Sequence, residues 1–280
     1  MIQIKQSIIL VSLLALVLGA FAACDKEPQP VDPVDPPFFN VATPLNYISE
    51  ENLTLAGDPA KSFFTYSEAL TAVPQGTHLG SRYEWAGIIP LVTNLEEPTL
   101  IFQQASEHLA VEEAIQIGDI KATYSSDYKN MGNGISYALR LAPAKAAAEE
   151  GFPPAQDKKL LTAYRYQVSE GKEGGFLVVT IRHLGECFDG TIEEIAQESF
   201  WAQNKQAAAE RRFPFAGAVD DGELVYVGTD GFYWTSTPDG DTSAYYVWIG
   251  EGAAGIFDDG KLVDNYRQMG HSVRPFADHL

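Results

Sequence analysis

Residues 64–85 read FTYSEALTAVPQGTHLGSRYEW, and this stretch predicts two short helices joined by a connecting segment. Thr65 and Glu68 have the spacing of a capping box, in which each of the two residues accepts a hydrogen bond from the backbone N–H of the other. Ser81 and Glu84 repeat that spacing. Each pair stands just before apolar residues at helical spacing, so each predicts the start of a helix.

Beyond this stretch the sequence becomes rich in strand patterns. One further capping box, at Thr191 and Glu194, predicts a third helix with an apolar face. The remaining apolar segments alternate or are rich in β-branched and aromatic residues, as is typical of strands. Two helices followed mostly by strands predict an α+β domain with an antiparallel or mixed sheet. The expected strands are residues 109–118, 135–141, 163–168, 176–184, 224–227, 244–249 and 272–276.

The first 23 residues predict export from the cytoplasm. They contain one cation, Lys5, no acidic residue, and an apolar run over residues 8–23. The run ends directly before Cys24 in a sequence that resembles the lipobox of bacterial lipoproteins. This resemblance implies cleavage before Cys24 and acylation of that residue, and acyl chains anchor a protein with about 0.8 kcal/mol per buried CH₂. The alternatives are a plain signal peptide cut after Ala23 and an uncut transmembrane anchor.

A proline-rich segment follows the cysteine. Residues 28–37 contain five prolines, and proline fixes φ and lacks an N–H donor, so the segment should be an extended spacer. No second low-complexity break occurs farther along the chain. We therefore expect a signal peptide over residues 1–23, a lipidated cysteine and tether over residues 24–40, and one displayed domain over residues 41–280.

The stretch at residues 64–85 resembles the opening of the Fibrobacter succinogenes major paralogous domain. Gly80 stands where that family usually has proline, and Thr235 stands where it usually has serine. The resemblance spans about residues 44–276. Later segments match the family in the same order, namely YALR at 137–140, AYRY at 163–166, RHLG at 182–185, RFPFAG at 212–217, GFYWTST at 231–237 and SVR at 272–274.

This resemblance implies a C-type-lectin-like fold, related to the formylglycine-generating domains. Such a domain has an antiparallel or mixed sheet, paired N- and C-terminal strands, two flanking helices and a long insert that carries ligand contacts. The formylglycine-generating relatives use two active-site cysteines, whereas this chain has only Cys187 besides Cys24. Serine-hydrolase, zinc-protease, Walker and dinucleotide motifs are also missing from the sequence. We therefore expect a protein that is not an enzyme.

The charge balance excludes partners that need a basic surface. The chain has 19 Lys and Arg against 38 Asp and Glu, for a net charge of −19. Nucleic acids are bound by clustered cations that displace their counterions, and no such cluster is present. We expect no nucleic-acid partner, and we expect contact with a membrane only through the N-terminal lipid.

Two acidic segments leave the question of calcium open. The tripeptide motifs with which sugar-binding C-type lectins hold calcium are missing from this sequence. Asp239 and Asp241, and likewise Asp258 and Asp259, could offer oxygen ligands to a hard cation. Asp-Gly pairs between strands are also ordinary hairpin turns. We expect no cofactor, with Ca²⁺ at these segments as the alternative.

The aromatic C-terminal third is the expected recognition region, with Trp234 as a core residue. Alternation over residues 244–249 places Val247 and Ile249 on one face and Tyr246 and Trp248 on the other. If the aliphatic face is core, the two rings point outward. The expected ligand-binding residues are Tyr246, Trp248, Asp239, Asp241, Tyr266 and Arg267. The alternative is that the insert covers the rings as a second small core.

These observations favour a lipid-anchored protein of the outer membrane or cell surface. Its displayed domain would be non-catalytic and would bind a glycan or a protein, in adhesion or ligand capture. Two alternatives are an accessory or tip subunit of a surface fibre and a binding protein diversified by a retroelement.

Overall fold

The structure is a computed structural model that describes residues 44–55, 61–92, 98–155, 161–171, 174–184, 188–202, 208–257 and 266–278. The chain divides into two compact units, Met1–Pro36 and Pro37–Leu280. The first unit, which contains the predicted signal peptide and Cys24, lies outside the described residues. The expected tether also lies outside them, and the structural description below concerns the second unit.

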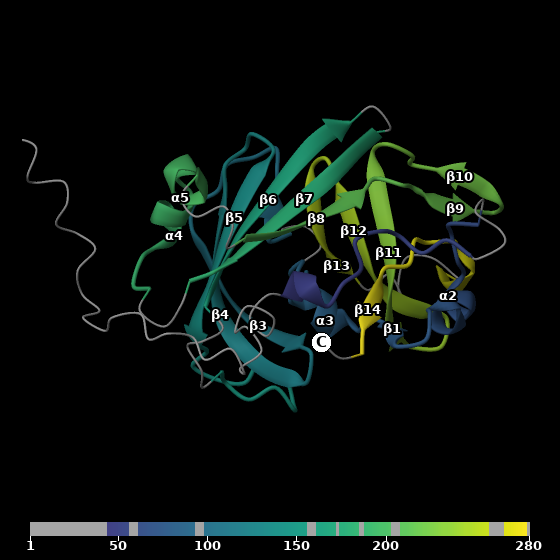
Figure 1. Cartoon of the computed structure of the whole chain (residues 1–280), viewed down its shortest axis with the longest axis horizontal. Helices are drawn as coiled ribbons and strands as arrows, with labels where there is room; N and C mark the ends of the chain where they lie inside the picture. The colour runs from purple at the N-terminus through teal and green to yellow at the C-terminus, as the bar shows by residue number, and fades with distance from the viewer. Residues whose placement is uncertain are drawn as a thin grey trace, which may run out of the picture. The chain divides into compact units, whose positions relative to one another are not determined.

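The larger sheet is an antiparallel meander of six strands in chain order, as Figure 1 shows. Each strand pairs with the next one along the chain. The strands are β3 (Leu109–Ile117), β4 (Ile120–Asn130), β5 (Ile135–Pro143), β6 (Thr162–Gly171), β7 (Gly174–His183) and β8 (Ala208–Pro214).

A second sheet of four strands has the order β11-β12-β13-β2, and all of its pairs are antiparallel. Two further pairs of short strands complete the sheets, β1 with β14 and β9 with β10. The strands are β1 (Thr77–Leu79), β2 (Leu100–Ile101), β9 (Ala218–Asp220), β10 (Glu223–Val225), β11 (Asp230–Asp239), β12 (Ser243–Gly250), β13 (Ala253–Phe257) and β14 (Pro275–Ala277).

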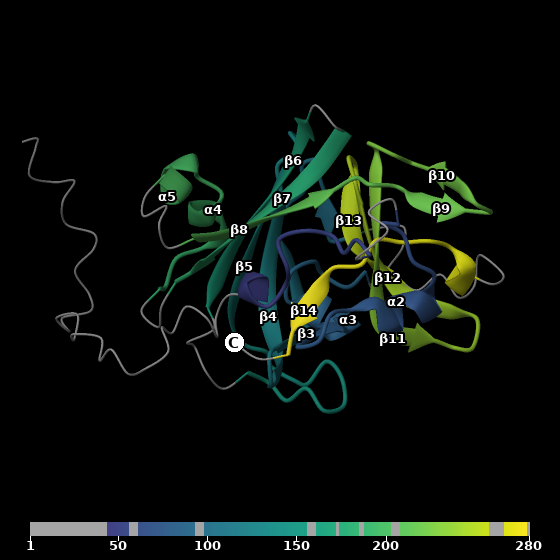
Figure 2. The ribbon, with the colours of Figure 1, turned by 45° about the vertical axis from the view of Figure 1, so that its right-hand side comes forward.

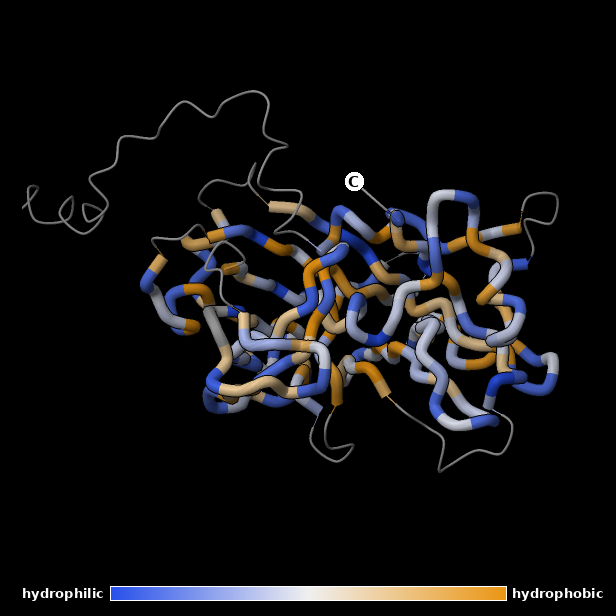
Figure 3. The backbone as a smooth tube through the Cα atoms, turned by 90° about the horizontal axis from the view of Figure 1, so that it is seen from below, coloured by the Kyte–Doolittle hydropathy of each residue, from blue (hydrophilic) through white to orange (hydrophobic). Residues whose placement is uncertain are grey.

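The main core lies between the two sheets and follows from residue alternation. On β7, Leu177, Val179 and Ile181 are buried every second residue, as the period of a strand requires. They share one apolar cluster with Val247 and Ile249 of β12. The alternation of apolar and polar segments along the chain is visible in Figure 3. Burying one face of each sheet against the other gives a sandwich-like arrangement.

The helices are short, and their starts are those that the capping boxes predict. All three capping boxes are formed. The expected third helix is instead two helices, because the chain leaves helical geometry at Ala196. The helices are α2 (Tyr66–Ala72), α3 (Arg82–Ala86), α4 (Ile192–Ile195) and α5 (Glu198–Ala202), with 3-10 turns η1 (Pro44–Asn46) and η4 (Tyr266–Gln268).

Polar side chains of the six-stranded sheet hold the end of α3. Arg140 donates to the carbonyl oxygens of Ala86 and Gly87, both at 3.1 Å. The hydroxyl groups of two buried tyrosines on β6 donate to the carbonyls of Gly87 and Ile88. These bonds satisfy carbonyls that a helix end leaves without intrahelical partners. Trp85 is fully buried beside them, as a core residue would be.

The expected α+β fold of C-type-lectin-like form is wrong. Of the described residues, 51% are in strands and 14% in helices, and the sheets are mostly antiparallel in a β-sandwich-like arrangement. The sequence prediction missed strands such as β4 and β8, where charged and polar residues interrupt the apolar pattern. Within the described residues, no helix is long and apolar enough to cross a membrane.

Candidate functional site

Two of the expected recognition rings are buried in a second core. Tyr246 is 6% exposed and Tyr266 is 3% exposed, and their ring centroids lie 5.0 Å apart. The expectation that Tyr246 points to solvent is therefore wrong, and the alternative of a second small core describes this part of the chain. The buried members of the cluster are Phe64, Tyr66, Ala69, Leu79, Trp234, Ala244, Tyr246, Phe257, Tyr266 and Val273.

The alternation along β12 correctly separates the two faces of the strand, but both faces of β12 are covered by other parts of the domain. Val247 and Ile249 belong to the core between the sheets, whereas Tyr246 packs in the second cluster. Trp248 is partly buried, and its indole N–H donates to the Asp230 carboxylate at 2.7 Å. Trp248 therefore lies at the margin of the second core.

His271 occupies the centre of this cluster, a position that no sequence pattern predicts for a histidine. Its ring stacks on that of Trp234, with centroids 4.1 Å apart. It is fully buried, and within the described residues neither ring nitrogen has a hydrogen-bond partner. Burial lowers the pKa of His271 to about 3. The ring is therefore neutral at physiological pH, and its position is structural.

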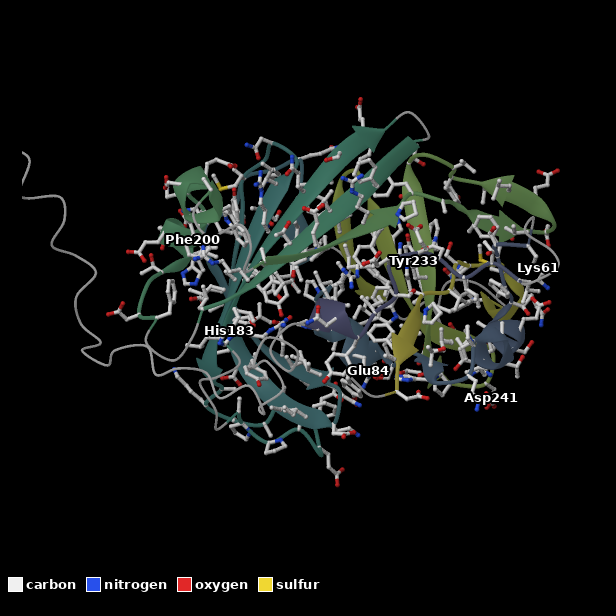
Figure 4. All side chains as sticks on the ribbon, viewed as in Figure 1. Lys61, Glu84, His183, Phe200, Tyr233 and Asp241 are labelled. Carbon is white, nitrogen blue, oxygen red and sulfur yellow. The ribbon has the colours of Figure 1, made fainter. Side chains whose placement is uncertain are left out.

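The turn between β11 and β12 holds the expected acidic residues. Asp239 is partly exposed, and Asp241 is exposed at the margin of the domain, as Figure 4 shows. The Arg267 guanidinium donates to the carbonyls of Gly240 and Ser243, both at 2.8 Å. These two carbonyl oxygens of the turn therefore already accept hydrogen bonds from a cationic side chain of the protein itself. Asp258 and Asp259 lie outside the described residues, and within those residues no three His, Cys, Asp or Glu side chains could hold a metal ion.

An open cleft of about 480 Å³ lies beside His78. The His78 ring bonds to the Glu84 carboxylate at 2.7 Å and to that of Asp278 at 2.9 Å. Figure 4 shows Glu84 beside β14. Burial opposes a charged imidazole here, but the two carboxylates outweigh it and raise the pKa of His78. Because Glu84 also caps α3, these contacts tie that helix to the C-terminal strand.

The most exposed apolar side chains of the described residues lie together on one hairpin. Leu224 is 55% exposed, Tyr226 is 59% exposed and Val227 is 54% exposed. They lie on β10 and directly after it, and Figure 2 shows β9 and β10 at the margin of the ribbon, away from the six-stranded sheet. Other exposed large apolar residues are scattered singly, which is normal for a surface. This exposed apolar group is the candidate interaction site of the described residues.

Backbone dihedral angles and hydrogen bonds define the geometry of this hairpin. Asp221 and Gly222 have φ of 47° and 82°, as in a two-residue turn that matches the twist of a hairpin. At the base, Val219 and Gly270 exchange two backbone hydrogen bonds of 2.8 Å. Tyr226 has φ of 59°, a left-handed conformation that is unusual for an aromatic residue.

The sequence predicted a strand over residues 224–227 but gave no reason to expect its exposure. Alternation can show which residues share a face, but it cannot show that neither face of a two-stranded hairpin is covered. The signal that could have identified the hairpin is the Asp221-Gly222 pair between two apolar segments. The signal for a surface role is the run of acids beside it.

Comparison with known proteins identifies a family but no function. No curated protein matches the chain, and no solved structure matches it. Residues 40–276 match a family described as a domain of unknown function, DUF8237. This match covers most of the chain, and the chain therefore belongs to the DUF8237 family.

Proposed function

We propose that this chain is a lipid-anchored protein of the cell envelope that displays a non-catalytic, protein-binding domain. Cys24 and the lipobox-like residues before it support the anchor, and the proline-rich segment supports the tether. The observation that carries the binding function is the exposed apolar group Leu224, Tyr226 and Val227 on the β9–β10 hairpin.

The chemistry of this hairpin favours a protein over a glycan as the ligand. Sugars stack on flat aromatic rings and exchange hydrogen bonds with polar groups, and here only Tyr226 is aromatic. Leu224 and Val227 offer aliphatic surface, which gains free energy when an apolar partner excludes water from it. Of the two rings that were expected to point outward and stack on a sugar, Tyr246 is buried and Trp248 is partly buried. The hairpin therefore suits a protein interface with an apolar centre.

The anchor is tested by the Cys24→Ser substitution in cells that are supplied with labelled fatty acid. The wild-type chain should take up the label and fractionate with membranes, because the Cys24 thiol is the attachment point of the lipid. The Ser variant should remain unlabelled and keep its signal peptide. Uptake of label by the Ser variant would show that the lipoprotein assignment is wrong.

The ligand class is tested with the purified full chain on protein and glycan arrays. Each array is read with calcium and with a chelator, for the wild type and for a Leu224→Ser/Tyr226→Asn variant. Asparagine tolerates the left-handed backbone at position 226, so this variant should fold. We expect binding to proteins that the variant loses. Glycan binding that the variant retains would overturn the proposed protein-binding function.

A further inference from the structure

The β9–β10 hairpin lies in a long segment that has no positive charge. From residue 213 to residue 260 the sequence contains no Lys, Arg or His. The same segment contains nine acidic residues, namely Asp220, Asp221, Glu223, Asp230, Asp239, Asp241, Glu251, Asp258 and Asp259. The segment that carries the exposed apolar side chains therefore has acidic residues and no basic ones.

Three of these acids border the exposed apolar group directly. Asp220, Asp221 and Glu223 are exposed at the end of the hairpin, next to Leu224 in the chain. Within the described residues, none of the ion pairs involves these three carboxylates. Their charge is therefore left for an external partner.

We propose that the hairpin, residues 218–227, docks a protein whose surface presents an apolar pocket bordered by lysine or arginine side chains. This inference rests on the proposed protein-binding function and specifies the partner. Leu224, Tyr226 and Val227 form the apolar centre of the contact, and the carboxylates form its rim. Such an arrangement has a desolvated centre that supplies affinity and a charged rim that supplies steering and specificity.

Charge excludes two other occupants of the same surface. A second copy of the chain would bring a net charge of −19 against the same acidic face, and like charges in an interface are unfavourable. An anionic bilayer repels a hairpin whose tip carries Asp220, Asp221 and Glu223, and membrane-inserting segments are instead rich in basic residues. A cationic protein satisfies both the apolar and the acidic features.

Hydrogen bonds hold the backbone of Tyr226 in place before a partner arrives. The Tyr226 carbonyl accepts from the N–H groups of Thr229 and Asp230, at 3.2 and 3.0 Å. Its ring lies 5.9 Å from that of Phe232. These contacts stabilise the left-handed backbone conformation of Tyr226, which would otherwise cost free energy. A backbone that is already held in this way loses little conformational entropy on binding, which favours affinity.

The probe for this inference is a set of three immobilised peptides of equal length. The first alternates lysine with leucine and phenylalanine, the second replaces each lysine by glutamate, and the third replaces each apolar residue by serine. Binding of the purified full chain is measured by interferometry over a range of NaCl concentrations. We expect binding to the first peptide alone, weakening as salt rises. Equal binding to the glutamate peptide, or none to the first, would overturn the inference.

Two matched charge variants show whether the hairpin carries the effect. Neutralising the rim in Asp220→Asn/Asp221→Asn/Glu223→Gln should weaken binding about tenfold or more and flatten the salt dependence. The control neutralises three exposed acids of the other sheet and its loops and should leave binding unchanged. Equal loss in both variants would mean that only the total charge acts, and would overturn the inference. The control is Glu107→Gln/Glu150→Gln/Glu170→Gln.

An apolar variant separates this inference from the proposed function. Leu224→Ser/Tyr226→Asn/Val227→Thr should lose the lysine-leucine peptide and keep the wild-type melting temperature, because exposed side chains contribute little to stability. One outcome is that the apolar variant loses binding to arrayed proteins while the rim-neutralised variant binds them as the wild type does. In that case the proposed protein-binding function stands, and the inference of a cationic partner is wrong. If the chain instead binds anionic vesicles through this hairpin, the membrane is the occupant and the inference fails. Unchanged binding of both variants contradicts both proposals.

Discussion

His271 predicts a loss of stability at acidic pH that one substitution can isolate. The folded chain holds this ring neutral because burial lowers its pKa to about 3, whereas the unfolded ring has a pKa near 6.5. Below pH 6.5 the unfolded state therefore binds a proton that the folded state does not. Stability should fall as the pH is lowered from about 6.5 towards 3.

The magnitude follows from these two pKa values. Between pH 7.5 and pH 5, linkage gives a loss of about 2 kcal/mol from this one group. The rings of Phe232, Trp234, Tyr246 and Tyr266 that surround His271 remain uncharged in this range. No neighbouring charge among them compensates a protonated ring.

The assay is urea unfolding of the wild type and of His271→Phe across this pH range. Phenylalanine keeps the ring contact with Trp234 but cannot bind a proton, so the variant should not show this loss. Carboxylates titrate in both proteins, and their contribution cancels in the difference. The difference in unfolding free energy should change by about 2 kcal/mol between pH 7.5 and pH 5. If the unfolding free energies of the two proteins changed in parallel with pH, the conclusion that His271 is buried without a hydrogen-bond partner would be refuted.

Further predictions concern the core, the buried ion pair and calcium. Trp85→Ala should lower the unfolding free energy by about 3–5 kcal/mol through a cavity, and an unchanged melting temperature would contradict its burial. Arg140→Met leaves the buried Glu113 carboxylate, 3.3 Å away, without its cationic partner, while the Tyr128 hydroxyl still donates to it at 2.8 Å; urea unfolding should show a loss of about 3–5 kcal/mol, and adding Glu113→Gln should recover part of it. Calcium at about 10 mM should leave the melting temperature unchanged, because Arg267 occupies the turn carbonyls, whereas a site of Kd near 10⁻⁴ M would add roughly 2.7 kcal/mol. A rise of several degrees that Asp239→Asn/Asp241→Asn abolishes would contradict this.

The helix starts could be predicted because capping is a local property. The side chains of Thr65, Ser81 and Thr191 act on backbone groups within their own helical turn, so residues nearby in sequence decide the outcome. Helix lengths could not be predicted in this way. The residues after Trp85 are apolar because they pack between two sheets, and their apolar character does not require a helix.

Some of the strands that were missed, such as β4 and β8, have polar residues on one or both faces. β4 contains Lys121, Ser125, Asp127 and Lys129, and it pairs along its whole length with β3 and β5. Its place in the sheet comes from backbone pairing with neighbours, which hydropathy alone does not show. Underestimating the strands in this way favoured the incorrect α+β fold.

The candidate site was misplaced for a related reason. Alternation along β12 correctly separated Tyr246 from Val247, but solvent exposure depends on what covers each face. His271 and η4 come from far along the chain and cover Tyr246. Leu224 and Tyr226 are exposed because nothing in the described part of the chain covers them, and local sequence cannot show this.

Photocrosslinking from position 226 in intact cells tests the proposed function most directly. A photoreactive phenylalanine analogue replaces Tyr226 in the membrane-anchored chain, and the same analogue at Leu109, an exposed residue of the other sheet, is the control. We predict one protein adduct from position 226, lost when the three rim carboxylates are neutralised and absent from the Leu109 control. Adducts only to lipid, or the same adducts from both positions, would contradict a protein-binding hairpin on a lipid-anchored domain.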